Sequence, residues 1–214
     1  MADWATISSL ATAGGTLVLA VATFAAVRSS NRSARLAERS LLLGLRPVLI
    51  GSRTDDPTEK VRWGDEHAAA VRGGTASIEI EGGVVYLAVA LRNVGAGLAV
   101  LQGWNVTVGR ATTTAPHPGV EEFRRQQRDL YIAPSDTGFW QAAVRDPEER
   151  LAKDLTAAIA GRQELTTYLL YGDHEGGQLT ISRFGVRPIP DDGWVAEIGR
   201  HWTLDTPDPR LRPE

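Results

Sequence analysis

The chain of 214 residues contains no cysteine and carries 23 basic against 26 acidic residues, a formal net charge of −3. This length allows one sizeable core or at most two small domains. The lack of cysteine excludes disulfide scaffolds, thiolate metal sites and cysteine nucleophiles. A mildly acidic body argues against a general nucleic-acid binder, which needs cations to replace phosphate counterions.

Residues 5–27 form an apolar stretch without a charged residue. As a helix this stretch extends about 35 Å, enough to cross a bilayer core of about 30 Å. A secretory signal peptide has a basic start and a shorter apolar run, whereas here the basic residues follow the stretch. We predict an uncleaved transmembrane anchor over residues 1–27, and the alternative is a buried helix of a globular core.

Residues 28–46 carry five arginines against one acid, Glu38. Cytoplasmic flanks of membrane spans are enriched in Lys and Arg, and anionic lipids attract such a block. The prediction is therefore a single-pass protein of the cell membrane, with its N-terminus outside and its C-terminal domain in the cytoplasm. Small residues at four-residue spacing, such as Ala11 and Gly15, leave a homo-oligomer through the membrane helix open.

The basic segment 28–46 is expected to continue as a juxtamembrane helix near the lipid headgroups until Pro47 stops it. Residues 54–77 are polar and rich in turn residues. We expect a loop there, with Trp63 packed against the domain.

Beyond residue 77 the hydrophobic pattern changes to the two-residue period of β-strands. Ile78 and Ile80 alternate with glutamates, and the apolar run 84–91 is typical of a central strand. Gly82-Gly83 between them predicts a tight hairpin. Other strands are predicted at 47–52, 104–108, 129–133, 137–144, 165–171 and 178–185, around a core containing Val85, Leu87, Val89, Leu91, Trp104, Val106, Leu169 and Ile181.

Two helical insertions and a tail complete the predicted domain. Asp146-Pro147-Glu148-Glu149 is a strong helix start, because an acid at the cap precedes proline at the first helical position. The helix is expected over 147–160, and residues 118–129 are predicted to hold a shorter one. Residues 191–214 are expected to lie along the domain as a tail.

Gly95 and Gly97 raise the question of a phosphate-binding glycine loop. A dinucleotide-binding fingerprint needs a third glycine and then a helix. Residue 100 is instead valine, and the segment after it alternates as a strand. We interpret the glycines as hairpin turn residues, with Asn93 and Gly95 able to adopt a positive φ.

The segments LRNVGAGLA (91–99), GWNVTV (103–108) and YIAPSDTGFWQAAV (131–144) resemble Ig-like β-sandwich modules of the CARDB-like group. The likeness covers roughly residues 84–144, and Pro134-Ser135 replaces the usual Pro-Gly turn. The arrangement of the whole chain is also similar to that of uncharacterised bacterial membrane proteins. In these proteins a single membrane span is followed by an Arg-Pro stop and then by such a domain. The resemblance implies a mainly β chain, with an Ig-like β-sandwich over 47–190 that serves binding or assembly and has no catalytic residues to transfer.

Asp173-His174-Glu175 is the densest ionisable cluster, and Glu121 and Glu122 are conceivable further ligands of a metal. A solvated turn is favoured, because adjacent side chains in a turn rarely converge on one ion. His201-Trp202 is interpreted as an anchor of the tail rather than a ligand site. The glycosylation sequon Asn105-Val106-Thr107 is discounted, since it lies in a strand of a cytoplasmic domain. We predict no catalytic, cofactor-binding or metal-ligating residue and no cofactor.

These observations favour a non-enzymatic, membrane-anchored interaction or scaffold protein. Its partners are then the lipid bilayer and an unidentified protein, with no nucleic acid. Two alternatives remain: a membrane-tethered sensor or regulator that binds a small ligand, and an enzyme with dispersed active-site residues.

Overall fold

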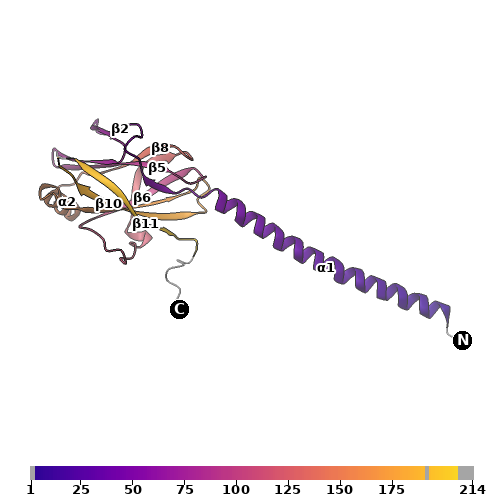
Figure 1. Ribbon diagram of the computed structural model, residues 1–214. Coiled ribbons are helices and arrows are strands. Elements are labelled where there is room, and N and C mark those ends of the chain that lie inside the picture. Colours follow the sequence, from indigo (N-terminus) through magenta and orange to yellow (C-terminus); the bar gives the residue numbers. More distant parts are fainter. Residues whose placement is uncertain (1–2, 191–192, 207–214) are drawn as a thin grey trace. The chain divides into compact units, whose positions relative to one another are not determined.

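The computed structural model describes residues 3–190 and 193–206, without the side chains of residues 4–11, 39 and 42–43. Two compact units make up the chain, Met1–Gly44 and Leu45–Glu214. The first unit is one helix, α1 (Trp4–Gly44), and the second is mainly β (Figure 1).

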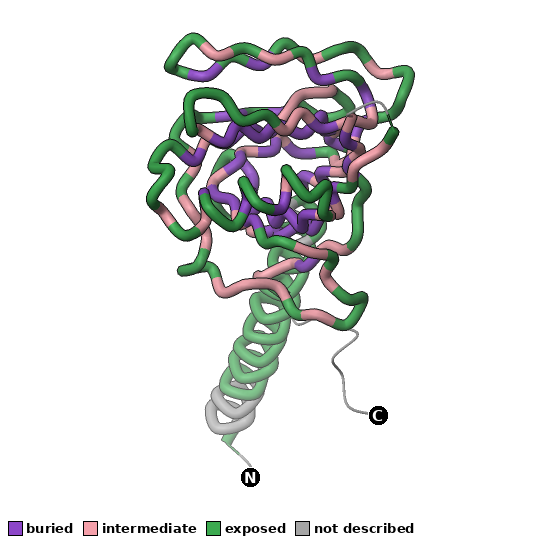
Figure 2. Tube along the Cα trace, turned by 90° about the vertical axis from the view of Figure 1, so that its left-hand side faces the viewer, coloured by how far each residue is buried: buried purple, intermediate pink, exposed green. Residues whose placement is uncertain are grey.

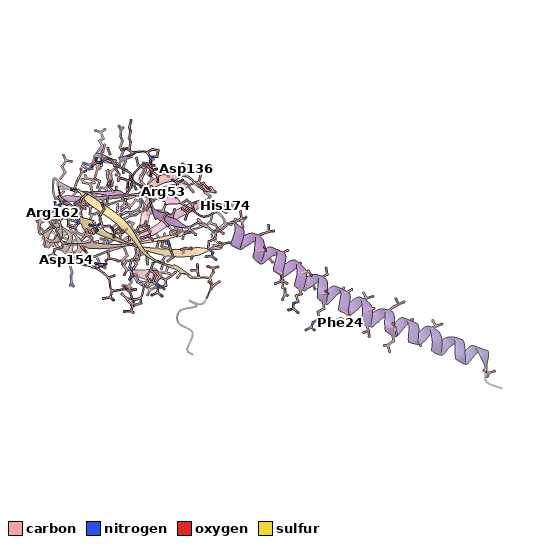
Figure 3. All side chains as sticks on the ribbon, in the orientation of Figure 1. Phe24, Arg53, Asp136, Asp154, Arg162 and His174 are labelled. Atoms are coloured by element: carbon pink, nitrogen blue, oxygen red, sulfur yellow. The ribbon has the colours of Figure 1, made fainter. Side chains whose placement is uncertain are left out.

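Helix α1 is the one helix in the described part of the chain that is long and apolar enough to cross a membrane, over Thr12–Glu38. Its described side chains are exposed, and Phe24 projects from its surface (Figure 3). The helix continues past Arg28, where the predicted anchor and juxtamembrane segments meet, because no breaker interrupts it. It ends at Gly44, ahead of Pro47, as predicted.

In its described residues, the second unit contains eleven strands and one α-helix, α2 (Arg150–Ala160), besides a short 3₁₀ turn at Val120–Glu122. The strands are β1 (Leu49–Gly51), β2 (Glu59–Arg62), β3 (Ala68–Val71), β4 (Thr75–Glu81), β5 (Val84–Asn93), β6 (Ala99–Val108), β7 (Arg124–Ile132), β8 (Thr137–Val144), β9 (Leu165–Gly172), β10 (Leu179–Pro188) and β11 (Trp194–Thr203). The mainly β class with an apolar N-terminal helix is therefore confirmed.

Nine of these strands form a single antiparallel sheet in the order β1-β5-β4-β11-β10-β9-β6-β7, with β8 on the other side of β5. Strand β11 holds the sheet together, because it pairs along β10 and also, at Trp194 and Val195, with β4. The sheet curls until its end strands β7 and β8 approach each other, and a side-chain hydrogen bond from Gln126 to Gln141 crosses the remaining gap.

The main core lies inside the curled sheet (Figure 2). Trp140, Tyr171 and Phe184 are its largest fully buried side chains. Helix α2 adds Leu155 to this core. All eight predicted core residues are buried, although Ile181 belongs to a separate cluster with Tyr168, Leu170 and Trp202.

The glycine pairs have two different roles. Gly82 and Gly83 have φ of 57° and 83°, the two positive values that a type I′ hairpin requires, so the predicted hairpin between β4 and β5 is confirmed. The hairpin predicted at Gly95 and Gly97 is wrong, since β5 and β6 pair with other strands. An added Cβ would lie 2.3 Å from the Arg46 carbonyl oxygen at Gly95 and 1.6 Å from that of Leu45 at Gly97. These glycines therefore permit close backbone approach, and neither they nor Asn93 has a positive φ.

Three other segments differ from the sequence prediction. Residues 118–129 were expected to be helical, but from Arg124 onward they form β7, because pairing with β6 outweighs helix propensity. The polar segment 54–77 contains the β2–β3 hairpin and the start of β4, and Trp63 is buried in it as expected. Much of the predicted tail 191–214 is strand β11, which pairs along β10 and buries Trp194, Ala196 and Trp202. Residues 191–192 and 207–214 of this prediction lie outside the described residues.

Candidate functional site: a basic cleft at the seam of the sheet

A cleft of about 410 Å³ opens where the end strands β7 and β8 face each other. We call it the seam cleft. Its volume falls in the range of ligand-binding sites, about 300–1,000 Å³. Five arginines and no acidic residue line it: Arg62, Arg124, Arg125, Arg128 and Arg145.

The β2–β3 hairpin supplies one wall of the seam cleft. Val61 and Val71 of this hairpin bury their side chains against Tyr86 and Ala88 of β5, on the outer face of the sheet. The indole N–H of Trp63 donates to the carbonyl oxygen of Ala142 in β8 at 3.0 Å. This packing places Arg62 and Trp63 beside the free edge of β8.

Two of the five arginines are already paired. Arg124 forms an ion pair with Glu149 and lies 5.4 Å from the ring centroid of Trp104. Arg145 lies 3.2 Å from an oxygen of Asp65 and donates to Gln127. The other three, Arg62, Arg125 and Arg128, make no ion pair or side-chain hydrogen bond with the described part of the chain.

Asp65 forms an ion pair with Arg145, one of the arginines that line the cleft. Burial acts to raise the pKa of Asp65, but hydrogen bonds from Tyr86 and from its own backbone, together with Arg145, outweigh burial and hold the pKa below its ordinary value. Burial and the nearby Asp65 raise the pKa of Tyr86. Asp65 therefore stays ionised at neutral pH, with the Tyr86 hydroxyl and Arg145 as its donors.

A histidine clamp ties the same hairpin to β4. The His67 ring stacks on Tyr86, with centroids 3.8 Å apart. Its Nδ1 lies 2.7 Å from Glu81 and its Nε2 lies 3.1 Å from Glu79, the latter at an angle outside hydrogen-bond geometry. This clamp holds the hairpin that carries Arg62.

Buried acceptors at the seam lack donors. Gln126 donates through Nε2 to the Gln141 carbonyl oxygen at 3.0 Å, while the side-chain Oε1 atoms of Gln126 and Gln141 are buried without a partner. Gln141 as a whole residue is only 6% exposed. A buried acceptor without a donor costs about 1–3 kcal/mol, so a ligand that brings N–H groups would recover this cost.

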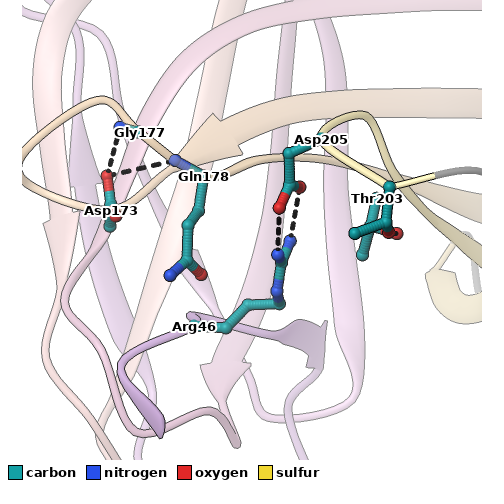
Figure 4. A network of polar contacts seen from close by, with 7 residues as sticks. Arg46, Asp173, Gly177, Gln178, Thr203 and Asp205 are labelled. Carbon is teal, nitrogen blue, oxygen red and sulfur yellow. Dashed lines mark hydrogen bonds and ion pairs between the residues drawn. The ribbon is translucent and has the colours of Figure 1, made fainter. Parts of the chain in front are cut away.

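In the acidic turn Asp173-His174-Glu175, the aspartate side chain accepts hydrogen bonds from backbone amides of the same turn. Asp173 is buried, and its Oδ1 accepts from the amides of Gly177 at 2.8 Å and Gln178 at 3.4 Å (Figure 4). His174 lies at the surface (Figure 3), and Glu175 is also exposed. Glu122 accepts from the Gly119 amide. Among the described residues no group of three or more His, Asp or Glu side chains is arranged to hold a metal.

His201 and Trp202 lie on strand β11. His201 contacts Ser182 at 2.7 Å, Ser182 contacts the Tyr171 hydroxyl at 2.8 Å, and that hydroxyl accepts from the Leu49 amide. Ser182 and Tyr171 are both 0% exposed, so this chain of hydrogen bonds joins four strands, β11, β10, β9 and β1, and offers no access to a substrate. Trp202 is buried, and the guanidinium carbons of Arg183 and Arg200 lie 5.4 and 5.0 Å from its ring centroid.

The arginines of the seam cleft were not identified from the sequence. They come from three separate segments, and the acidic body conceals them in the overall charge. The sequence signal for them is the run Arg124-Arg125-Gln126-Gln127-Arg128, whose good helix formers predict a helix instead of a strand. Comparison with family models, curated proteins and solved structures finds no match for the chain.

Proposed function

We propose that the protein is a non-enzymatic, membrane-anchored binding module, and that the seam cleft is its binding surface. The observation that carries the proposal is the gathering of five arginines and no acid along a cleft at two free strand edges. Like charges in a cleft concentrate their field and attract a partner of opposite charge. The partner is therefore anionic where it contacts the domain.

The proposal includes the membrane topology expected from the sequence. Helix α1 would cross the cell membrane through Thr12–Glu38, with its N-terminus outside. The arginines after residue 27 support a cytoplasmic position of the β domain. The bilayer and an anionic protein are then the two partners, and a homo-oligomer through α1 stays a prediction.

We also propose that the domain is a divergent relative of the CARDB-like Ig modules that residues 84–144 resemble. Antiparallel strands with buried residues facing one core support this relationship. The strand order, with β11 joining the two halves into one sheet, is where the domain departs from a simple sandwich.

Site-specific photo-crosslinking in the native membrane tests the binding surface. A photoreactive residue at Gln127 in the seam cleft should give a discrete adduct, which Arg125→Glu combined with Arg128→Glu should abolish. The matched control carries the photoreactive residue at Arg72, which is exposed and lies outside the cleft. The same adduct from both positions, or one insensitive to the charge reversal, would contradict the proposal.

A small-ligand sensor is the second candidate, because the cleft volume of about 410 Å³ also suits a small anionic molecule. Native mass spectrometry of the purified full chain separates the two functions. A bound small molecule lost in the same double variant would favour the sensor, whereas a protein adduct favours the binding module.

A further inference from the structure

The free edge of β8 carries a feature that basic charge alone does not explain. Strand β8 pairs with β5 on one side and with no described strand on the other. A free edge presents unpaired backbone N–H and C=O groups, which another strand can bind. Charged residues often protect such an edge, but protection needs neither a cleft nor buried acceptors.

A side-chain amide occupies one hydrogen-bonding position along this edge. The Gln126 carboxamide donates to the main-chain carbonyl of Gln141 at 3.0 Å, from the opposite strand β7. A carboxamide offers the same kind of N–H donor and C=O acceptor as a peptide bond. Gln126 therefore makes a bond that a backbone N–H of an added strand would make in its place.

We infer that the seam cleft binds an acidic peptide in extended conformation, which adds as a strand to the free edge of β8. This inference rests on the proposed function and specifies the partner. An extended peptide supplies backbone N–H donors, which suit the unpartnered Oε1 of the buried Gln141. Its acidic side chains suit the unpaired Arg125 and Arg128.

The combination of groups distinguishes a peptide from other anions. Inorganic phosphate and lipid phosphates offer negative charge to the arginines but few or no donors to a buried amide oxygen. An extended peptide places alternate side chains on opposite faces. Acids at every second position therefore project on one face of the peptide, toward the arginines that line the cleft, while main-chain bonds give most of the affinity.

The experiment uses the full chain in nanodiscs of zwitterionic lipid and measures fluorescence anisotropy. The probe is a labelled ten-residue peptide that alternates Glu and Thr. We expect saturable binding that weakens with added salt and at least tenfold in the Arg125→Glu, Arg128→Glu double variant. The Arg72→Glu control should bind as the unmodified chain does.

Two further measurements test strand addition itself. The same peptide methylated at each internal backbone nitrogen keeps its charges but loses its donors, and it should bind at least tenfold more weakly. Gln126→Ala removes the competing amide and should tighten binding several-fold. The inference would be overturned if the methylated and unmethylated peptides bound with equal affinity. It would also be overturned if the Gln126→Ala variant bound the unmethylated peptide no more tightly than the unmodified chain does.

Other anions separate this inference from the proposed function. Inorganic phosphate, phosphatidylserine vesicles and a ten-residue oligothymidylate are tested against the same variants. If one of them binds in an Arg125- and Arg128-dependent way while the peptide does not, strand addition is wrong and the basic binding surface stands. If no probe distinguishes the double variant from the unmodified chain, both proposals fail.

Discussion

The side chain of Asn93 donates a hydrogen bond of 2.7 Å to the carbonyl oxygen of Gly97. Its Nδ2 also donates to Ile132, and its Oδ1 accepts from the amides of Val48 and Gly95. The residue is 0% exposed. One carboxamide therefore satisfies four backbone groups from three segments of the chain, and its bonds to the Gly97 and Ile132 carbonyl oxygens are buried.

Replacing Asn93 with alanine should destabilise the domain by about 3 kcal/mol or more, because two buried carbonyl oxygens lose their donor at about 1–3 kcal/mol each and two half-buried amides lose their acceptor. Asn93→Asp should be no better, since a carboxylate cannot donate to two carbonyl oxygens. Chemical denaturation measures both. Asn105→Ala is the control, because Asn105 makes one partly exposed bond, to Glu122, and its loss should cost under about 1 kcal/mol. Similar costs for the two alanine variants would refute this account.

Gly97→Ala should also destabilise the domain, by about 1–3 kcal/mol or more, because the new methyl group meets the Leu45 carbonyl oxygen at 1.6 Å. The matched control is Gly185→Ala, where nothing lies within 4 Å of the added Cβ. Thermal unfolding compares the two. A lower midpoint for the control than for Gly97→Ala would show that close approach is not the reason for glycine here.

The pair of Arg46 and Asp205 should make stability depend on acid pH. Arg46 donates to Asp205 at 2.9 and 2.5 Å (Figure 4), and this bond chiefly lowers the pKa of Asp205 from its ordinary 3.8. A lowered folded-state pKa gives stability that is present above the unfolded pKa and is lost as pH falls through the folded value. Asp205→Asn should therefore cost at most about 1 kcal/mol at pH 7 and nothing well below pH 3.8. A cost that persists undiminished at pH 2.5 would point to packing instead.

Trp104→Ala should cost about 3–5 kcal/mol, as expected for a large core side chain. Trp104 is 5% exposed and meets Trp140 edge-on, with centroids 5.9 Å apart. Equilibrium denaturation gives the value. A midpoint unchanged within error would remove Trp104 from the core.

The topology is tested by fusing reporters to the C-terminus, one active only outside the membrane and one only inside. We expect activity from the inside reporter alone and a protein that retains residues 1–27. Changing Arg28, Arg32, Arg35 and Arg39 to Gln, with lysines added after Met1, should invert the protein, because the basic flank sets orientation. If orientation ignores this exchange, the charge argument is wrong.

Local signals in the sequence predicted the elements that depend on local chemistry. Gly82-Gly83 specified a hairpin because the turn needs a positive φ at both residues. The apolar run of β5 specified a central strand, which β4, β1 and β8 flank. Ala133 to Asp136 formed the predicted turn, with Ser135 at a φ of 64°.

The sequence does not predict the features that depend on pairing between segments far apart in the chain, and the reason is physical. Strand β7 alternates half-buried Arg124 and Gln126 with exposed Arg125 and Gln127, a weak pattern that its good helix formers obscure. The roles of Gly95 and Gly97 follow from the segment before β1, which periodicity cannot place beside them. The seam cleft likewise exists only once the sheet has curled.

The position of β11 sets the order in which the domain can be completed during synthesis. This strand leaves the ribosome after all the other described strands, yet it is the one that pairs both β10 and β4. Until β11 has emerged, the nascent chain holds two groups of paired strands with no strand-to-strand pairing between them in the described sheet. Their exposed edges are open to pairing with neighbouring chains during this time, so the polypeptide stays prone to aggregation until β11 has paired with both β4 and β10.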